Sequence, residues 1–175
     1  MTDAVLPDEA TEALGRQEAF EDAGDGWYRI TTTAFEARVT AEETDGPLCT
    51  YTLEVRAPML SAATEDSVGD AVEAGWFETY DRRLEDAPKA VRDTLELSDR
   101  RVFEEAGDAV AVFVFDFGNP TRAFRITKAM AEFVEGTYME GIVPGYSYTD
   151  PVAQLLSRAR QAGGDGDGTR GPMPL

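Results

Sequence analysis

The residues that could bind a ligand fall into two groups along the chain. One group is basic and surrounds a predicted helix start, with Asn119 as the cap and Arg122 and Arg125 in the following turns. The start of a helix favours an anion, because its free N–H groups and its dipole both point outward. A phosphate or carboxylate could therefore bind there. Alternatively, the arginines pair with surplus acids such as Glu132.

The second group is aromatic and lies near predicted loops and glycines. Its members are Trp76, Phe77, Tyr138, Tyr146 and Tyr148. Tyrosine and tryptophan combine an apolar body with a polar tip, which suits interfaces and ligand pockets. The alternative is that these side chains fill the core or cover a strand.

Catalytic and metal-binding combinations are missing from the sequence. The chain has no histidine and a single cysteine, Cys49, which excludes a Ser-His-Asp triad, a Cys-His nucleophile, an internal disulfide and the usual zinc site. The acidic pair Glu104-Glu105 is explained by a hydrated surface, and the Gly/Asp run over 163–168 lacks the distal glutamate of a calcium loop. We expect no metal, no cofactor and no catalytic residue.

The charge balance of the sequence indicates the solvent to which the protein is adapted. The 175 residues include 34 acidic and 16 basic ones, so the formal net charge is −18. A small soluble domain usually carries a charge of about 2–8 in magnitude, and repulsion within a more highly charged chain destabilises its compact state. At molar salt the Debye length falls to about 3 Å and this repulsion is screened. The sequence predicts a halophilic protein, whose acidic clusters reflect its salt and not catalysis.

Charge and chain start also bear on partners and location. A negative surface disfavours nucleic acid, because counterion release needs a positive surface and weakens as salt rises. The first residues, Met1-Thr2-Asp3, lack the basic and apolar regions of a signal peptide, and no apolar run approaches the ~20 residues of a membrane span. We expect a cytoplasmic protein with no nucleic-acid and no membrane partner.

The hydrophobic periods predict an α+β fold. The expected elements are a helix from Pro7, a loop over 21–26, strands over 27–33, 35–42 and 49–56, a helix from a capping box at 67–70, strands over 100–105 and 109–117, a helix from Asn119-Pro120 to Gly136 or Gly141, and a last helix from Asp150-Pro151 to Gly163. Residues 91–97 fit either a strand or an irregular segment.

The order α-β-β-β-α-β-β-α-α predicts one antiparallel sheet of about five strands. We expect a single domain over residues 1–162, followed by a disordered tail over 163–175 that is rich in Gly, Asp and Pro. The order alone is similar to that of small secretion chaperones, acidic dimers that bind extended segments of partner proteins. This is an analogy between folds.

The strand over 109–117 is apolar on both sides. Its valines lie on one face and its phenylalanines on the other: Val110, Val112 and Val114 against Phe113, Phe115 and Phe117. Such a strand is expected to be covered on both faces. Helices can cover one face, and the other calls for another helix or a second copy of the protein. The pattern therefore predicts a homodimer as one solution.

Four motifs carry a family resemblance. They are GWFET at 75–79, RLEDAP at 83–88, GNP at 118–120 and VEGTYMEGIVPGY at 134–146. Through these motifs residues 7–161 resemble a haloarchaeal family of unknown function. The resemblance implies a haloarchaeal cytoplasmic protein and transfers no catalytic residue.

These observations favour a non-enzymatic protein-interaction module, chaperone-like or an adaptor, with a protein partner and a homodimer as its expected associations. The alternative is a small-ligand-binding protein or enzyme with an anion site at Asn119 and Arg122. A pocket that joins Arg122 with Tyr138 and Tyr146 would favour this alternative.

Overall fold

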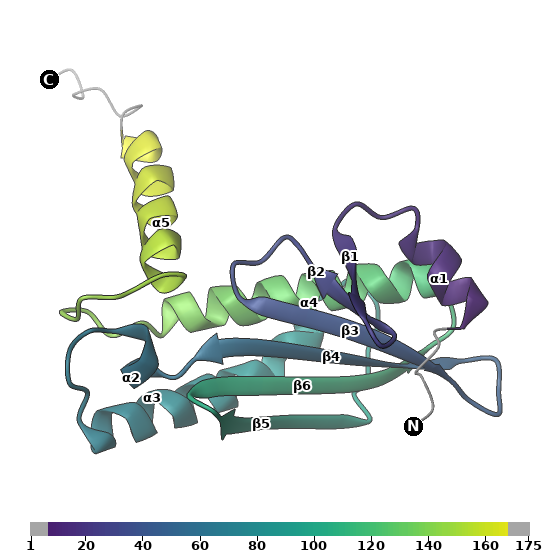
Figure 1. Cartoon of the computed structure of the whole chain (residues 1–175), viewed down its shortest axis with the longest axis horizontal. Helices are drawn as coiled ribbons and strands as arrows, with labels where there is room; N and C mark the ends of the chain where they lie inside the picture. Colours follow the sequence, from purple (N-terminus) through teal and green to yellow (C-terminus); the bar gives the residue numbers. More distant parts are fainter. Residues whose placement is uncertain (1–6, 168–175) are drawn as a thin grey trace, which may run out of the picture.

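The computed structural model describes residues 7–167, and side chains as far as residue 162 (Figure 1). Its elements are α1 (Asp8–Leu14), β1 (Phe20–Gly24), β2 (Trp27–Ile30), β3 (Glu36–Glu43), β4 (Cys49–Pro58), α2 (Leu60–Ala63), α3 (Asp70–Arg83), the 3₁₀ helix η1 (Leu84–Ala90), β5 (Asp99–Glu105), β6 (Asp108–Phe117), α4 (Pro120–Glu140) and α5 (Val152–Asp167). Residues 168–175 of the predicted tail lie outside the described residues.

One antiparallel sheet organises the fold, in the strand order β1-β2-β3-β4-β6-β5. The predicted α+β class with one antiparallel sheet is confirmed, with six strands instead of about five. The additional strand is β1, where the sequence predicts a loop, and Phe20 of this strand pairs with Ile30 of β2. Only Phe20 of β1 is buried, so an exposed edge strand shows no alternating apolar pattern. Asp25 has a φ of 55°, which lets the chain reverse tightly between the two strands.

Helix boundaries follow local chemistry in α4 and depart from it elsewhere. The Asn119 side chain accepts a hydrogen bond of 3.0 Å from the backbone N–H of Arg122, as the sequence predicts. Of the two predicted ends, Gly136 and Gly141, the structure has Gly141, which caps α4 after Glu140. The predicted capping box at 67–70 is wrong, because Gly69 precedes α3 and no side chain caps it. The predicted end of α5 at Gly163 is also wrong. A glycine costs a helix only about 1 kcal/mol and does not end it unaided.

The core lies between the sheet and the helices on one of its faces. Figure 1 shows α3 and α4 on the same side of the sheet and α5 extending away from it. Strand β4 contributes the buried Tyr51 and Leu53 to this core, β6 contributes Phe113, and α4 contributes Phe124 and Met130. The irregular segment 91–97 connects η1 to β5 and carries half-buried apolar side chains.

The other face of the sheet is closed by its own side chains. Val110 and Val112 point to this face and are 0% and 5% exposed, although no helix of the described chain covers them. Arg56 of β4 lies beside Val110 on one side and Phe103 of β5 on the other. Such long side chains can bury an apolar neighbour under their stems. A covering helix is therefore not found in this part of the chain, and a covering second copy stays a prediction.

Ion pairs hold the Arg56 stem in place. Its guanidinium lies 3.0 Å from a carboxylate oxygen of Glu54 and 3.7 Å from one of Asp108, and it also pairs with Glu105. Hydrogen bonding to Glu105 raises the pKa of Arg56, whereas the partial burial of Arg56 opposes this rise. One arginine therefore bridges three carboxylates, and its stem shields Val110.

We expect Arg56→Ala to lower the free energy of unfolding by about 2 kcal/mol, because it exposes Val110 and leaves the three carboxylates to repel one another. Arg56→Met keeps an apolar stem and should cost about half as much. Urea unfolding tests both variants, and about 2 M KCl should reduce the cost of the methionine variant by screening the carboxylates. Equal costs for both variants at both salt concentrations would contradict the shielding of Val110.

Candidate functional site

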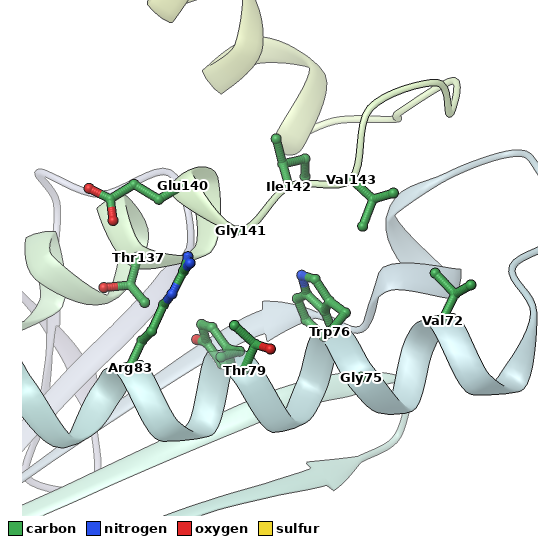
Figure 2. Close-up of a pocket in the computed structure, with 11 residues that line it drawn as sticks. Val72, Gly75, Trp76, Thr79, Arg83, Thr137, Glu140, Gly141, Ile142 and Val143 are labelled. Carbon is green, nitrogen blue, oxygen red and sulfur yellow. The ribbon is translucent and has the colours of Figure 1, made fainter.

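A pocket of about 370 Å³ lies between α3 and the C-terminal end of α4. Most of its lining comes from one side of α3, the last turn of α4 and the chain that follows it: Val72, Gly75, Trp76, Thr79, Arg83, Glu140, Ile142 and Val143 (Figure 2). In Figure 2, Trp76 rises from α3 toward Ile142, and Arg83 reaches from α3 to the last turn of α4. The pocket therefore depends on contacts between two helices that are distant in sequence.

A second hollow of about 430 Å³ continues the pocket past Arg83. The two hollows share Arg83, Thr137 and Glu140, and the second adds Asp86, Phe133 and Gly136. We call the two together the α3–α4 groove. From Val72 to Arg83 the helix rises about 16 Å at 1.5 Å per residue. An extended peptide of about five residues has this length.

The groove combines an apolar wall with a few polar groups. Val72 is 42% exposed, and the Trp76 ring stacks on Tyr80 at 5.4 Å between centroids with an angle of 7°. Within the described chain Arg83 forms no ion pair and no side-chain hydrogen bond, and its guanidinium lies against Gly141. This arrangement can bind an apolar side chain and donate a hydrogen bond to a neighbouring acceptor.

Tyr80 presents the most unusual polar group of the lining. Its side chain is buried, and its hydroxyl has no hydrogen-bond partner among the described residues. Burial raises the pKa of this phenol well above its ordinary value. A buried polar atom without a partner costs about 1–3 kcal/mol. The Tyr80 hydroxyl is therefore closed off from the solvent, and Tyr80 lines the groove without offering it this polar group.

Tyr138 supports the groove from below and does not line it. The side chain is 0% exposed, and its hydroxyl donates a hydrogen bond of 2.9 Å to the carbonyl of Pro58. Its ring meets Phe35 and Trp76 edge-on, at centroid distances of 4.7 and 5.3 Å. The sequence singles out Tyr138 for binding, and the structure places it in the core.

The remaining aromatic candidates fix nearby segments. Phe77 is half-buried and packs against the core. The Tyr148 hydroxyl donates to the carbonyl of Val143, and the Tyr146 ring meets the Tyr148 ring at 6.3 Å. These two tyrosines therefore position the loop that supplies Val143 to the groove.

The basic candidates lie at the opposite end of α4. Arg122 pairs with Asp93, and its guanidinium lies 5.7 Å from the centre of the Phe117 ring. Arg122 and Arg125 line a separate hollow of about 330 Å³. Tyr138 is about 24 Å further along the helix, at 1.5 Å per residue. No pocket in the described structure joins Arg122 with the tyrosines.

Three residues of the groove are not predicted from the sequence to bind a ligand. Gly75, Thr79 and Arg83 are spaced by four residues and form one row along α3. This row lies beside Val72 and Trp76, which are also spaced by four residues. The sequence signal that could have revealed these residues is a second row of small and polar side chains, on the side of α3 that meets α4.

Two further findings concern the residues that the structure describes. No helix there has the length and apolar character to cross a bilayer. No group of three or more acidic or cysteine side chains in the same part of the chain is placed to hold a metal ion.

Comparison with known proteins identifies a family. The sequence model of a family of unknown function (DUF5813) matches residues 15–158. No curated protein matches the chain, and no solved structure matches it. The match confirms the resemblance to an uncharacterised family, while the haloarchaeal origin stays a prediction. Because the match covers most of the chain, the protein belongs to the DUF5813 family, whose function is unknown.

Proposed function

We propose that this protein is a non-enzymatic module that binds an extended segment of a partner protein in the α3–α4 groove. The observation that carries the proposal is the groove itself, which follows α3 from Val72 to Arg83 and combines an apolar wall around Trp76 with polar groups such as Arg83 and Glu140. Peptide grooves use this combination, since apolar pockets bind side chains and polar groups bind the peptide backbone.

The polar groups of the groove match a peptide backbone. Arg83 can donate to a carbonyl oxygen, and the exposed Glu140 carboxylate can accept from a backbone N–H. An apolar side chain of the segment would then contact Val72 and Trp76.

The composition of the lining supports binding over catalysis. Its hydroxyl groups belong to Thr79, Thr137 and Tyr80, and no imidazole can activate them because the chain has no histidine. The one thiol, Cys49, does not line the groove, and burial together with the Glu43 carboxylate raises its pKa. A raised pKa keeps a thiol protonated and unreactive.

Gly75 offers a direct test of the groove. A glycine inside a helix costs about 1 kcal/mol relative to alanine, and apart from the neighbouring α3 backbone no heavy atom lies within 4 Å of the position that a Cβ would take. A side chain at this position would therefore enter the pocket without disturbing α3. Gly75→Met should fill the pocket and leave the protein folded.

Binding can be followed through Trp76 alone. Trp27, the other tryptophan, lies under the Arg38 guanidinium in the sheet, so Trp27→Phe leaves Trp76 as the sole indole reporter. In this background we would titrate a library of peptides of about ten residues, long enough to span the groove. We expect binders that shift the Trp76 emission, and at least a roughly tenfold weaker affinity for Gly75→Met, because the pocket is filled.

Ala74→Met is the matched control. Ala74 is exposed on the same helix and does not line the groove, so its replacement should leave peptide affinity unchanged. Circular dichroism and thermal unfolding establish that both methionine variants are folded. The proposal fails if no peptide shifts the Trp76 emission, or if both variants bind the peptides as tightly as the parent protein.

A further inference from the structure

We infer that a second site, independent of the groove, binds a small phosphate monoester with an apolar body. The site is the hollow of about 330 Å³ between residues 90–93 and the N-terminal half of α4. The side chains that define this arginine hollow are Val91, Arg92, Asp93, Arg122, Arg125 and Ile126. Its volume lies at the small end of the range for ligand sites, about 300–1,000 Å³.

The charge of the arginine hollow opposes that of the whole protein. Three arginines and one aspartate line it, in a chain whose net charge is −18. Between Asp116 and Glu132 the chain carries no acidic residue, although α4 begins within this stretch. Cationic side chains near a helix start oppose the helix dipole, so helix stability does not explain this placement.

The arginines are only partly neutralised. Asp93 pairs with Arg122. Within the described chain neither Arg92 nor Arg125 forms an ion pair or a side-chain hydrogen bond. Arginine forks bind phosphate oxygens in pairs, with a geometry that a lone ammonium group cannot offer. Arg92 and Arg125 thus line a shared hollow, and neither is paired with an acid of the described chain.

The side of α4, and not its start, forms the site. The Asn119 side chain already occupies the backbone N–H of Arg122, so it acts as a helix cap and not as a ligand group. The predicted anion site at Asn119 and Arg122 is thereby relocated by about one helical turn, to Arg122, Arg125 and the facing Arg92. The arginine side chains supply the donors that the helix start does not.

Charge and shape select the ligand class. The three arginines and Asp93 leave two positive charges, which match a phosphate monoester of charge about −2 at neutral pH and exceed the single charge of a carboxylate. Val91, Ile126 and Ala129 give the hollow an apolar surface. This surface favours a phosphate that carries an apolar group over inorganic phosphate.

Calorimetric titration with three probes tests the site. Phenyl phosphate should bind at least about tenfold more tightly than benzoate, which lacks the second charge. It should bind about threefold or more tightly than inorganic phosphate, which lacks the ring. Binding should weaken in about 2 M KCl, because salt screens an exposed charged site.

Variants of the full chain locate the site. Arg125→Gln should lower the affinity for phenyl phosphate at least about tenfold, because it removes a charge-assisted pair of hydrogen bonds. Arg158→Gln, an exposed arginine on α5, is the matched control and should bind as the parent protein does. Asp93→Asn should tighten binding about threefold or more, because it removes the competing carboxylate from Arg122. Gly75→Met, which blocks the groove, should bind phenyl phosphate normally.

Four results would overturn the inference, provided that thermal unfolding shows the variants to be folded. If benzoate binds as tightly as phenyl phosphate, the site does not select a phosphate. If inorganic phosphate binds as tightly as phenyl phosphate, the site does not recognise an apolar body. Equal affinity of Arg125→Gln and Arg158→Gln places the binding elsewhere. Weaker binding by Asp93→Asn shows that the aspartate supports the ligand instead of competing with it.

Discussion

Tyr138→Ala should lower the free energy of unfolding by about 3–5 kcal/mol, the usual cost of removing a large buried aromatic side chain. The Tyr138 ring joins four parts of the chain, because it meets Phe35, Trp76 and Tyr80 edge-on and bonds the Pro58 carbonyl. Its loss leaves a cavity beneath the groove. Urea unfolding measures the effect, and a loss below about 1 kcal/mol would contradict the central role of this ring.

Two phenylalanine variants separate the ring from its hydroxyl. Tyr138→Phe removes the hydrogen bond to Pro58 and should cost about 1 kcal/mol. Tyr80→Phe removes a buried hydroxyl that has no partner in the described structure, so it should be neutral or stabilise the protein by about 1 kcal/mol. Opposite signs for two tyrosines in contact are the expected result. A loss of stability in Tyr80→Phe would show that its hydroxyl is already bonded.

Stability should fall steeply above about pH 10, the pKa of a tyrosine in an unfolded chain. Burial raises the pKa of Tyr51, Tyr80 and Tyr138 well above this value in the folded protein. Below pH 10 both states hold the phenolic protons and the stability is complete. Above it only the unfolded state releases them, so each tyrosine removes about 1.4 kcal/mol per pH unit, and the three together remove about 4.

Simultaneous measurement of phenolate absorbance and circular dichroism tests this expectation. The native stability of a domain is about 5–15 kcal/mol, so the protein should unfold within a few pH units above 10. The phenolates of the three tyrosines should appear together with the loss of secondary structure. Tyr80→Phe should reduce the slope of stability against pH by about one third. Ionisation of these tyrosines while the protein stays folded would contradict their burial.

Local chemistry made parts of the fold predictable. Asn119-Pro120 predicts the start of α4 because the cap bonds a backbone N–H that the helix leaves free. The alternation in β6 predicts a strand with two apolar faces, and in the structure this strand lies between β4 and β5. The strands predicted over 100–105 and 109–117 are separated by only a few residues, and the structure joins β5 and β6 there by a tight turn at Ala106 and Gly107, both with positive φ.

Other features depend on tertiary contacts that no local pattern records. Strand β1 forms because β2 presents a free edge to it, so its own exposed residues carry no periodic signal. The groove exists because α3 and the end of α4 meet, and the sequence spacing of Gly75 and Arg83 does not reveal which helix they face. The aromatic candidates were partly predictable: Trp76 lines the groove, whereas Tyr138 holds it from within.

The ion pairs around Arg56 also limit where another molecule can bind on the sheet. A molecule that contacts Val110 from the open side of the sheet would first have to separate Arg56 from Glu54, Glu105 and Asp108, whereas Phe103 on the same face is 37% exposed. On the helical side, no ion pair of the described residues covers the pocket that Trp76 and Tyr80 line. We therefore expect a peptide partner to bind in the α3–α4 groove on the helical side and not over Arg56.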